Sequence, residues 1–309
     1  MSEITKQLLT MVSDYDDSKG YADAYSIREN GSCVERRSTE HIQIDSKEDN
    51  PGLVIRVQPG TKGERVSIPA CVTHGDIDDV VYNDFYIGEG ADVLIVAGCG
   101  VHVQTGEPAR HNGIHRFFLD KGARVLYKEK HVGTGKGIGL KRIDPVTEIT
   151  LGEGASLEME TIQLGGVDTT DRRTEATLGP RARLTIHESL MTDGVETAQT
   201  DFVVSMDGED SAVDLISRSV AKGESRQEYR SRIKGNCRCT GHSECDAILV
   251  DRGTVNAAPE LYAGDIDAEL IHEAAIGKIA GEQIVKLRTL GLTEEQAEEK
   301  IIEGFLRGK

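Results

Sequence analysis

One phrase recurs through the middle of the chain: a Gly- or Asp-rich turn, a small residue and then an alternating strand. It reads IGEGADVLIVA, LDKGARVLYKE, LGEGASLEMET, LGPRARLTIHE and MDGEDSAVDLI, and the first three copies are evenly spaced. Fixed-period repetition of a turn and a strand is typical of solenoids and propellers. We expect each copy to be one coil of a β-helix, with glycine supplying the positive φ of the corner and the small residue tucked inside it: Ala91, Ala123, Ala155 and Ala182.

A β-sandwich also has many short strands and is the alternative fold, but the repeat favours the β-helix. Composition agrees with a chain of strands joined by tight turns, because it has 34 Gly against 7 Pro. Aromatic residues make up 4% of the chain and Trp is absent. The core must therefore be built from Val, Ile, Leu and Ala.

The two ends of the chain differ from the middle. Residues 2–15 place Ile4, Leu8, Leu9 and Val12 at helical spacing, which predicts a short amphipathic helix. Alternating strands follow from about residue 34 to residue 255. We therefore divide the chain into an N-terminal helical segment (1–33), a β-helix core (34–257) and a C-terminal helical region (258–309).

Helical spacing returns after residue 255. Asp267 is placed to cap a helix with its apolar residues at 270, 271, 274, 275 and 279, and Gly281 is expected to kink it. Gly291 is predicted to follow a helix end. Thr293 and Gln296 form a capping box for a last helix.

Charge and cysteine content limit the environment and the partners. The net charge is −17, which argues against nucleic acid as the main partner. The N-terminus lacks a secretory signal and no apolar run is long enough to cross a bilayer, so we expect a cytoplasmic protein. There six cysteines are more typical of ligands or buried thiols than of disulfides.

The densest chemical cluster is GNCRCTGHSECDA, with Cys237, Cys239, His242 and Cys245 in one short run. Residues two apart on a strand share a face, and a turn at Gly241 could bring the others back. The spacing matches no standard zinc knuckle. A ligand or thiol role is favoured, while a buried cysteine acting as a small apolar residue stays the alternative for each thiol.

Two further groups of ionisable residues stand out. His272 and Glu273 lie in AELIHEAAIGKIAGEQI, where a solvent-facing pair on a helix competes with a binding site. Cys99 lies near four histidines on neighbouring coils, for which a metal or acid–base site is conceivable: His102, His111, His115 and His131.

These segments together resemble the SufB/SufD family, the core proteins of the SUF system of iron–sulfur cluster assembly. The resemblance rests on GHSECDAILV, on the run from PELYAGDIDAELIHEAAIGKIAGEQI to the end, and more loosely on GCGVHV and HRFFLDKGARVLYKEKH. It implies a right-handed parallel β-helix flanked by helices and a scaffold rather than an enzyme. It also implies a SufC-like ABC ATPase docked on the C-terminal helices, and a transient cluster between two core subunits.

The resemblance assigns roles to single residues. Cys245, His272 and Glu273 match the cluster-assembly positions. Cys99 matches a cysteine associated with sulfur uptake from a desulfurase, and His131 falls at a tunnel position. On the C-terminal helices the residues expected to bind the partner are Glu282, Leu287, Leu290 and Phe305.

Three features of the sequence depart from the family pattern and affect the predicted assembly. The chain is shorter than typical SufB, Cys237 and Cys239 are extra thiols with an auxiliary role at most, and Cys245 occurs together with the His–Glu pair. The combination indicates a homodimer in which symmetry doubles the ligands, with a second core subunit as the alternative. Mixed Cys, His and Glu donors suit a labile iron–sulfur cluster.

Two other functions compete. A zinc-binding structural module could use Cys237, Cys239, His242 and Cys245. A β-helix carbohydrate-active enzyme would need carboxylates along one exposed face.

Overall fold

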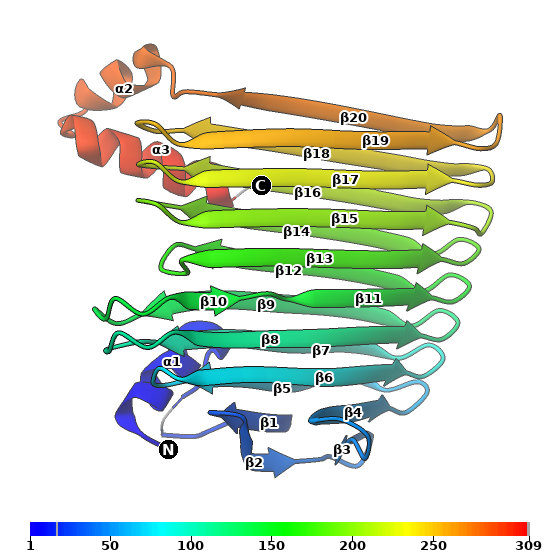
Figure 1. Ribbon diagram of the computed structural model, residues 1–309. Helices are drawn as coiled ribbons and strands as arrows, with labels where there is room; N and C mark the ends of the chain where they lie inside the picture. The colour runs from blue at the N-terminus through cyan, green and yellow to red at the C-terminus, as the bar shows by residue number, and fades with distance from the viewer. Residues whose placement is uncertain (17, 308–309) are drawn as a thin grey trace.

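A computed structural model describes residues 1–16 and 18–307, so the last two residues of the predicted C-terminal region lie outside the described part. The chain forms a β-solenoid of about 8 turns with 58% of its residues in strands. Figure 1 shows two sheets stacked face to face, with α1 (Glu3–Ser13) near one end and α2 (Gly281–Arg288) and α3 (Glu294–Arg307) near the other. The predicted β-helix, N-terminal helix and C-terminal helices are confirmed.

Each coil gives one strand to each sheet. The first sheet runs in the spatial order β2 (Ser32–Arg37), β1 (Ala24–Glu29), β5 (Lys62–Val72), β7 (Asp92–His102), β9 (Arg124–Thr134), β12 (Ser156–Leu164), β14 (Arg183–Thr192), β16 (Ser211–Ala221), β18 (Cys239–Leu249) and β20 (Ala268–Gly277). The second runs β19 (Thr254–Ala263), β17 (Arg226–Gly235), β15 (Thr197–Met206), β13 (Thr169–Leu178), β10 (Lys141–Ile143), β8 (Ala109–Leu119), β6 (Ile77–Ile87), β4 (Gly52–Val57) and β3 (Ile42–Ser46), with β11 (Val146–Leu151) between β8 and β13.

The corners follow the repeat. Gly90, Gly122 and Gly154 have φ of +66°, +64° and +66°, and each amide donates to a carbonyl of the next coil. The alanines after them are fully buried. Later coils place Arg181 and Asp210 at positive φ, at a cost of roughly 1–2 kcal/mol each because their Cβ atoms crowd the backbone.

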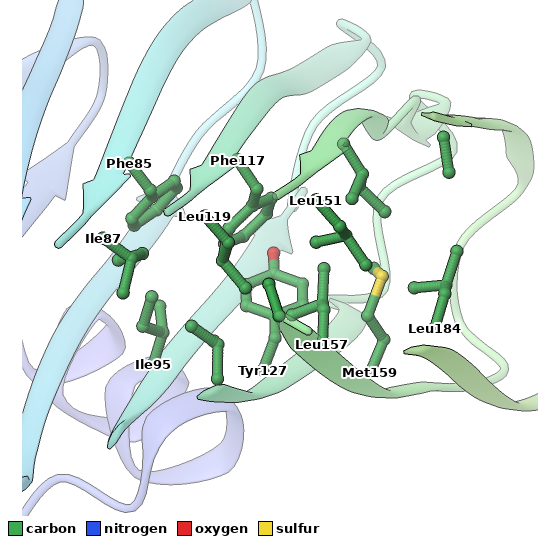
Figure 2. Close-up of a cluster of buried hydrophobic side chains, with 14 of the residues drawn as sticks. Phe85, Ile87, Ile95, Phe117, Leu119, Tyr127, Leu151, Leu157, Met159 and Leu184 are labelled. Carbon is green, nitrogen blue, oxygen red and sulfur yellow. The ribbon is translucent and has the colours of Figure 1, made fainter. Parts of the chain in front are cut away.

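Alternation along the strands sends every second side chain into the space between the sheets. In Figure 2 that space is filled by Phe85, Phe117, Tyr127 and aliphatic side chains. The Phe85 and Phe117 rings stack with centroids 4.5 Å apart, and Tyr127 meets Phe117 edge-on. Few aromatics thus suffice, because they gather in consecutive coils.

The N-terminal helix packs on the outside of the first sheet through Leu8, Leu9 and Val12, as its spacing predicted. Two glycines let it approach. A Cβ on Gly98 would meet Val12 at 2.3 Å, and one on Gly100 would meet Leu8 at 3.0 Å. The GCG run therefore places Cys99 inward beneath a closely packed helix.

The predicted helix from Asp267 is wrong, because those residues form β20, which pairs in parallel with β18 from Cys239↔Ala268 to Ile248↔Gly277. Its sequence, AELIHEAAIG, fits both periods, and the strand form satisfies the otherwise bare edge of β18. β19 is likewise a strand within the region expected to be helical. Helices begin only at Gly281, the first residue of α2 rather than a kink.

Two further predictions concern where the strands begin and how the last helix is capped. Strands begin at Ala24 rather than near residue 34, because Asn30 and Gly31 take positive φ and form the hairpin between β1 and β2. The capping box before α3 is confirmed, since the Thr293 amide donates to Gln296 Oε1 and the Gln296 amide to Thr293 Oγ1. Among the described residues, no helix is long and apolar enough to cross a membrane.

Candidate cluster-assembly site and polar interior

The structure separates Cys245 from the other two cysteines of the GNCRCTGHSEC run, whereas the side chains of Cys237 and Cys239 lie within hydrogen-bond reach of each other. Gly241 lies within β18 and makes no turn, so the expected return of the chain there is wrong. Cys239 and Cys245 both point inward on β18, six residues apart, which is about 20 Å at the rise of a strand. His242 points outward, and its Nδ1–H donates to Asp214 Oδ1 at 2.8 Å. The zinc module therefore has no common site, and no group of three or more metal-ligating side chains gathers anywhere in the described chain.

Cys245 lies one strand from the C-terminal end of the solenoid. Its side chain is 1% exposed, and burial raises the pKa of its thiol to about 12, with Glu188 adding to the shift. At neutral pH the thiol is protonated in this conformation. It becomes a metal ligand only when the metal displaces the proton or the end of the solenoid opens.

His272 and Glu273 lie on β20, the last strand. His272 is in register with Ser243, which is fully buried, so the imidazole lies on the inner face, with Nδ1 buried and unpartnered. It is diagonal to Cys245, about 8 Å away by sheet geometry. Glu273 is in register with Glu244 and faces out. One chain thus brings Cys245 and His272 to the same end but leaves Glu273 on the opposite face.

Cys99 and His131 are direct neighbours, in register on β7 and β9 and both buried. Burial raises the pKa of the Cys99 thiol well above its ordinary value, with Glu129 adding to the effect. Burial likewise lowers the pKa of the His131 imidazole. The Cys99 thiol is therefore protonated at neutral pH.

A row of buried polar side chains, which the sequence analysis did not predict, connects the Cys99–His131 pair with Cys245. On consecutive strands of the first sheet, the inward positions in register are Glu129, Thr161, Glu188, Ser217 and Cys245. The first four are all under 5% exposed. Charged residues at inward parity, such as Glu129 two positions after Tyr127, were the signal that could have revealed it.

Arg172, on the facing sheet, links the row. Its guanidinium lies 2.8 Å from Glu129 Oε2 and 3.3 Å from Glu188 Oε1. Ser217 Oγ donates to Glu188 Oε2 at 2.7 Å, and His131 Nε2 lies 3.4 Å from Glu129 Oε1. Because the nearby histidines and Arg172 outweigh its burial, the pKa of Glu129 stays well below its ordinary range. The interior thus holds a charged, connected path from His131 to the neighbour of Cys245.

The other histidines next to Cys99 serve separate contacts. His111 Nδ1 lies 3.1 Å from Asp79 Oδ2. His115 Nδ1 lies 2.7 Å from the Tyr127 hydroxyl, and burial lowers the pKa of His115 to about 4. His102 contacts Thr134 at 2.8 Å. The metal site considered for this group is not formed.

Of the expected partner-binding residues, Glu282 and Leu287 lie on α2 and Phe305 lies on α3, while Leu290 lies in the connection between the two helices. Glu282 and Leu290 are exposed, Leu290 by 75%. Leu287 is half-buried, and Phe305 packs with Ile302 and Leu306 against the solenoid. Half of this set is therefore free to meet another molecule.

Comparison with known proteins agrees with this architecture. Residues 82–305 match the family model for the SufBD core domain of the SUF system of FeS cluster assembly. An iron–sulfur cluster assembly SufBD family protein of Methanothermobacter thermautotrophicus is 30% identical over 263 residues, covering 82% of this chain and 62% of the relative. A SufBD family protein of Archaeoglobus fulgidus is 30% identical over 270 residues, covering 86% and 71%.

A relative from Methanocaldococcus jannaschii is 24% identical, with 88% of this chain and 87% of the relative covered. The chain belongs to the SufBD family. It spans less than two thirds of the length of the Methanothermobacter relative.

Proposed function

We propose that this chain is a cytoplasmic scaffold on which iron–sulfur clusters are assembled for transfer to other proteins. The observation that carries the proposal is the position of Cys245 and His272. A buried thiol and an unpartnered imidazole lie on the inner face of the last two strands of one sheet. The cluster is the cargo of such a site rather than a resident group.

The last coil favours a core dimer with the cluster between subunits. β19 and β20 each pair with one neighbour only, so each leaves a ten-residue edge without a partner strand in the described chain. Inward positions of this coil are exposed, Leu261 and Ile276 by 40% each. Bare edges beside apolar side chains are a template for another chain. A two-fold axis there doubles Cys245 and His272 at one seam.

The same geometry explains how a cluster could be held loosely. Glu273 faces away from Cys245 within one chain, so the subunits would have to shift or combine for all three donors to meet. If the S, N and O donors are divided between two chains, a small movement of one subunit relative to the other separates them and releases the cluster. A closed pocket of four thiolates would not release its cluster so readily.

The polar row supports passage of sulfur through the solenoid, from Cys99 to Cys245. The two cysteines are five strands apart in one sheet, about 24 Å, and the positions between them carry Glu129, Glu188 and Ser217 instead of aliphatic side chains. Polar and charged groups this deep cost stability. Their presence is explained if thiol sulfur moves beside them.

A SufC-like ABC ATPase is proposed to dock on α2 and α3. Glu282 and the 59% exposed Val285 of α2 are exposed there, as is Leu290 in the connection between the two helices. ATP-driven movement of these helices would pull on β20, which ends at Gly277, and so open the seam. Unchanged binding of such an ATPase to Leu290→Glu would contradict this placement.

The decisive experiment is anaerobic reconstitution with ferrous iron and sulfide. Cys245→Ala is expected to lose most bound iron and acid-labile sulfide, and His272→Ala to lose a large part. Cys239→Ala is the matched control, since Cys239 is also a buried inward thiol of β18 but lies about 20 Å away. Circular dichroism checks that each variant is folded. Full cluster absorbance in Cys245→Ala and His272→Ala would overturn the assignment.

A further inference from the structure

A cavity of about 260 Å³ opens at the N-terminal end of the solenoid. Its walls come from the β1–β2 hairpin, the segment before β4, and the strands β5 to β8. Three cationic side chains line it, together with two histidines and two thiols: Arg28, Arg36, Lys47, His111, His115, Cys33 and Cys99. Not one Asp or Glu belongs to the lining, although the whole chain carries a net charge of −17.

Carboxylates outside the lining pair with two of the three lining cations and leave Arg36 without one. Asp79 pairs with Arg28 at 2.6 Å, and Asp84 is shared between Lys47 and Arg116. Arg36 has no carboxylate within ion-pair distance in the described chain; its Nη1 donates to Ser46 Oγ at 3.0 Å. Asp49 also lies 3.7 Å from Lys47, so the four cations meet three carboxylates. The one excess positive charge lies at Arg36, and it attracts anions to the cavity.

Two polar groups of the lining lack partners. The Nε–H of Arg36 is buried without an acceptor, and Oδ1 of Asn83 is buried without a donor. Asn83 is 4% exposed. Buried polar atoms without partners are costly. The oxygens of an anion would accept from Arg36 Nε–H, and Asn83 Oδ1 would be satisfied by the ammonium group of a donor such as cysteine persulfide. The cavity lies below the roughly 300–1,000 Å³ of sites for drug-sized ligands, so it suits a small anion.

The thiols place sulfur chemistry at this site. Along the first sheet, Cys33, Arg28, Ala70, Cys99 and His131 are in register on consecutive strands. Cys33 is the exposed cysteine of the six, at the rim, and Cys99 is buried in the wall. The cavity therefore leads from solvent, past an exposed thiol and fixed cations, to the start of the polar interior.

We propose that this cavity binds a small anion that carries a transferable sulfane sulfur, and that Cys33 is the thiol that accepts this sulfur. The inference rests on the proposed function, for which it names the class of sulfur donor. Cys33 suits acceptance better than Cys99, because burial raises the pKa of the Cys99 thiol and the thiolate is the nucleophile.

The step balances without an oxidant. The Cys33 sulfur attacks the terminal sulfur of a donor S–X, a new S–S bond forms, and the S–X bond breaks with its electron pair leaving on X. With thiosulfate, Cys33–SH and S–SO₃²⁻ give Cys33–S–SH and SO₃²⁻. Arg36 and Lys47 hold the anionic end, and their charge stabilises the leaving sulfite.

The test uses the reduced, metal-free full chain with thiosulfate as the probe and cysteine persulfide in a parallel arm. Peptide mass spectrometry after alkylation reports which cysteine gains one sulfur atom. We expect saturable modification of Cys33 by at least one of the two donors, and competition by sulfate, which has the same charge and shape but no transferable sulfur. A preference for thiosulfate identifies an inorganic donor, and a preference for cysteine persulfide an organic one.

Arg36→Ala is expected to raise the half-saturating concentration at least tenfold. Arg37→Ala is the matched control, because Arg37 lies on the same strand and does not line the cavity. Cys33→Ser is expected to abolish the modification and Cys99→Ser to retain it. Modification that is non-saturable, insensitive to sulfate and equal in Arg36→Ala would show an exposed thiol only and overturn the proposal, as would modification of Cys99 alone or none from either donor.

Failure here is distinguishable from failure of the scaffold proposal. Free sulfide bypasses the donor site, so Cys33→Ser is expected to assemble cluster as well as the parent when sulfide is supplied. If the parent assembles cluster from sulfide but no donor modifies Cys33, only the donor site is refuted. If neither protein assembles cluster from sulfide, the scaffold proposal fails.

Discussion

The two ends of the solenoid solve the same problem in opposite ways. Any stack of parallel strands exposes hydrogen-bonding edges at its first and last coils. At the N-terminal end, two antiparallel hairpins, β1–β2 and β3–β4, extend the sheets, so the edges there are the short strands β2, of six residues, and β3, of five. Helix α1 packs nearby on β5 and β7. At the C-terminal end β19 and β20 stay bare, and α2 and α3 lie to one side (Figure 1).

The interior of the solenoid also differs between the two ends. Near the N-terminal end it holds stacked aromatic rings and a cation-lined cavity, and near the C-terminal end it holds half-exposed aliphatic side chains and two candidate ligands. A closed end suits a small-molecule site, because its walls are fixed. An open end suits a protein interface. The difference between the two ends shows how the two proposed activities, sulfur uptake and cluster assembly, can occupy opposite ends of one solenoid.

The largest expected difference between the ends concerns packing. Phe117→Ala is expected to destabilise the chain by about 3–5 kcal/mol, because the ring is fully buried between Phe85 and Tyr127. Ile276→Ala, on the half-exposed last coil, is expected to cost below about 1 kcal/mol. Urea unfolding at low protein concentration measures both. Equal losses would mean that the last coil is as tightly packed as the closed end.

The closed end should also be the acid-sensitive one. The pKa of His115 is lowered to about 4 by burial, so between the unfolded value of about 6.5 and pH 4 the unfolded chain binds a proton that the folded chain does not. Stability is complete above about pH 6.5 and falls by up to ~3 kcal/mol as the pH drops towards 4. His115→Gln should flatten part of this slope in urea unfolding from pH 7 to 5. An unchanged slope would place the sensitivity elsewhere.

The smallest effect concerns association through the open end. Glutamate at Leu261 and Ile276 would put charge on the exposed inner positions of the last coil and weaken self-association at least tenfold, about 1.4 kcal/mol. Analytical ultracentrifugation measures the change. Ile138→Glu is the control, because Ile138 is 93% exposed in the turn after β9. An equal effect of both changes would show that bulk charge, not the open end, controls association.

Much of the fold follows from local chemistry. The period of glycine corners and alternating strands predicts the solenoid, Leu8, Leu9 and Val12 predict the first helix, and Thr293 with Gln296 predicts the start of the last. The secondary structure of residues 268–277 could not be predicted from the sequence, because the spacing of their apolar residues suits a helix as well as a strand. Only the free edge of β18 selects the strand.

The candidate site shows the same division. The resemblance to the SufB/SufD family singled out Cys245, His272 and Cys99 from a larger set of thiols and histidines, and their roles remain predictions. Sequence could not show that Cys239 lies about 20 Å from Cys245, that Glu273 faces outward, or that Cys33 shares a cavity with Cys99. Such facts depend on which strands become neighbours.

By itself, then, the sequence determined the repeating unit, because turn chemistry and side-chain alternation act over a few residues. The tertiary structure decided which residues meet. Register between coils aligns Glu129, Glu188, Ser217 and Cys245 into one row, although long stretches of chain separate them. Stacking also decides that the free edges are short at the N-terminal end and ten residues long at the C-terminal end, since an edge is defined by the strand that is missing beside it.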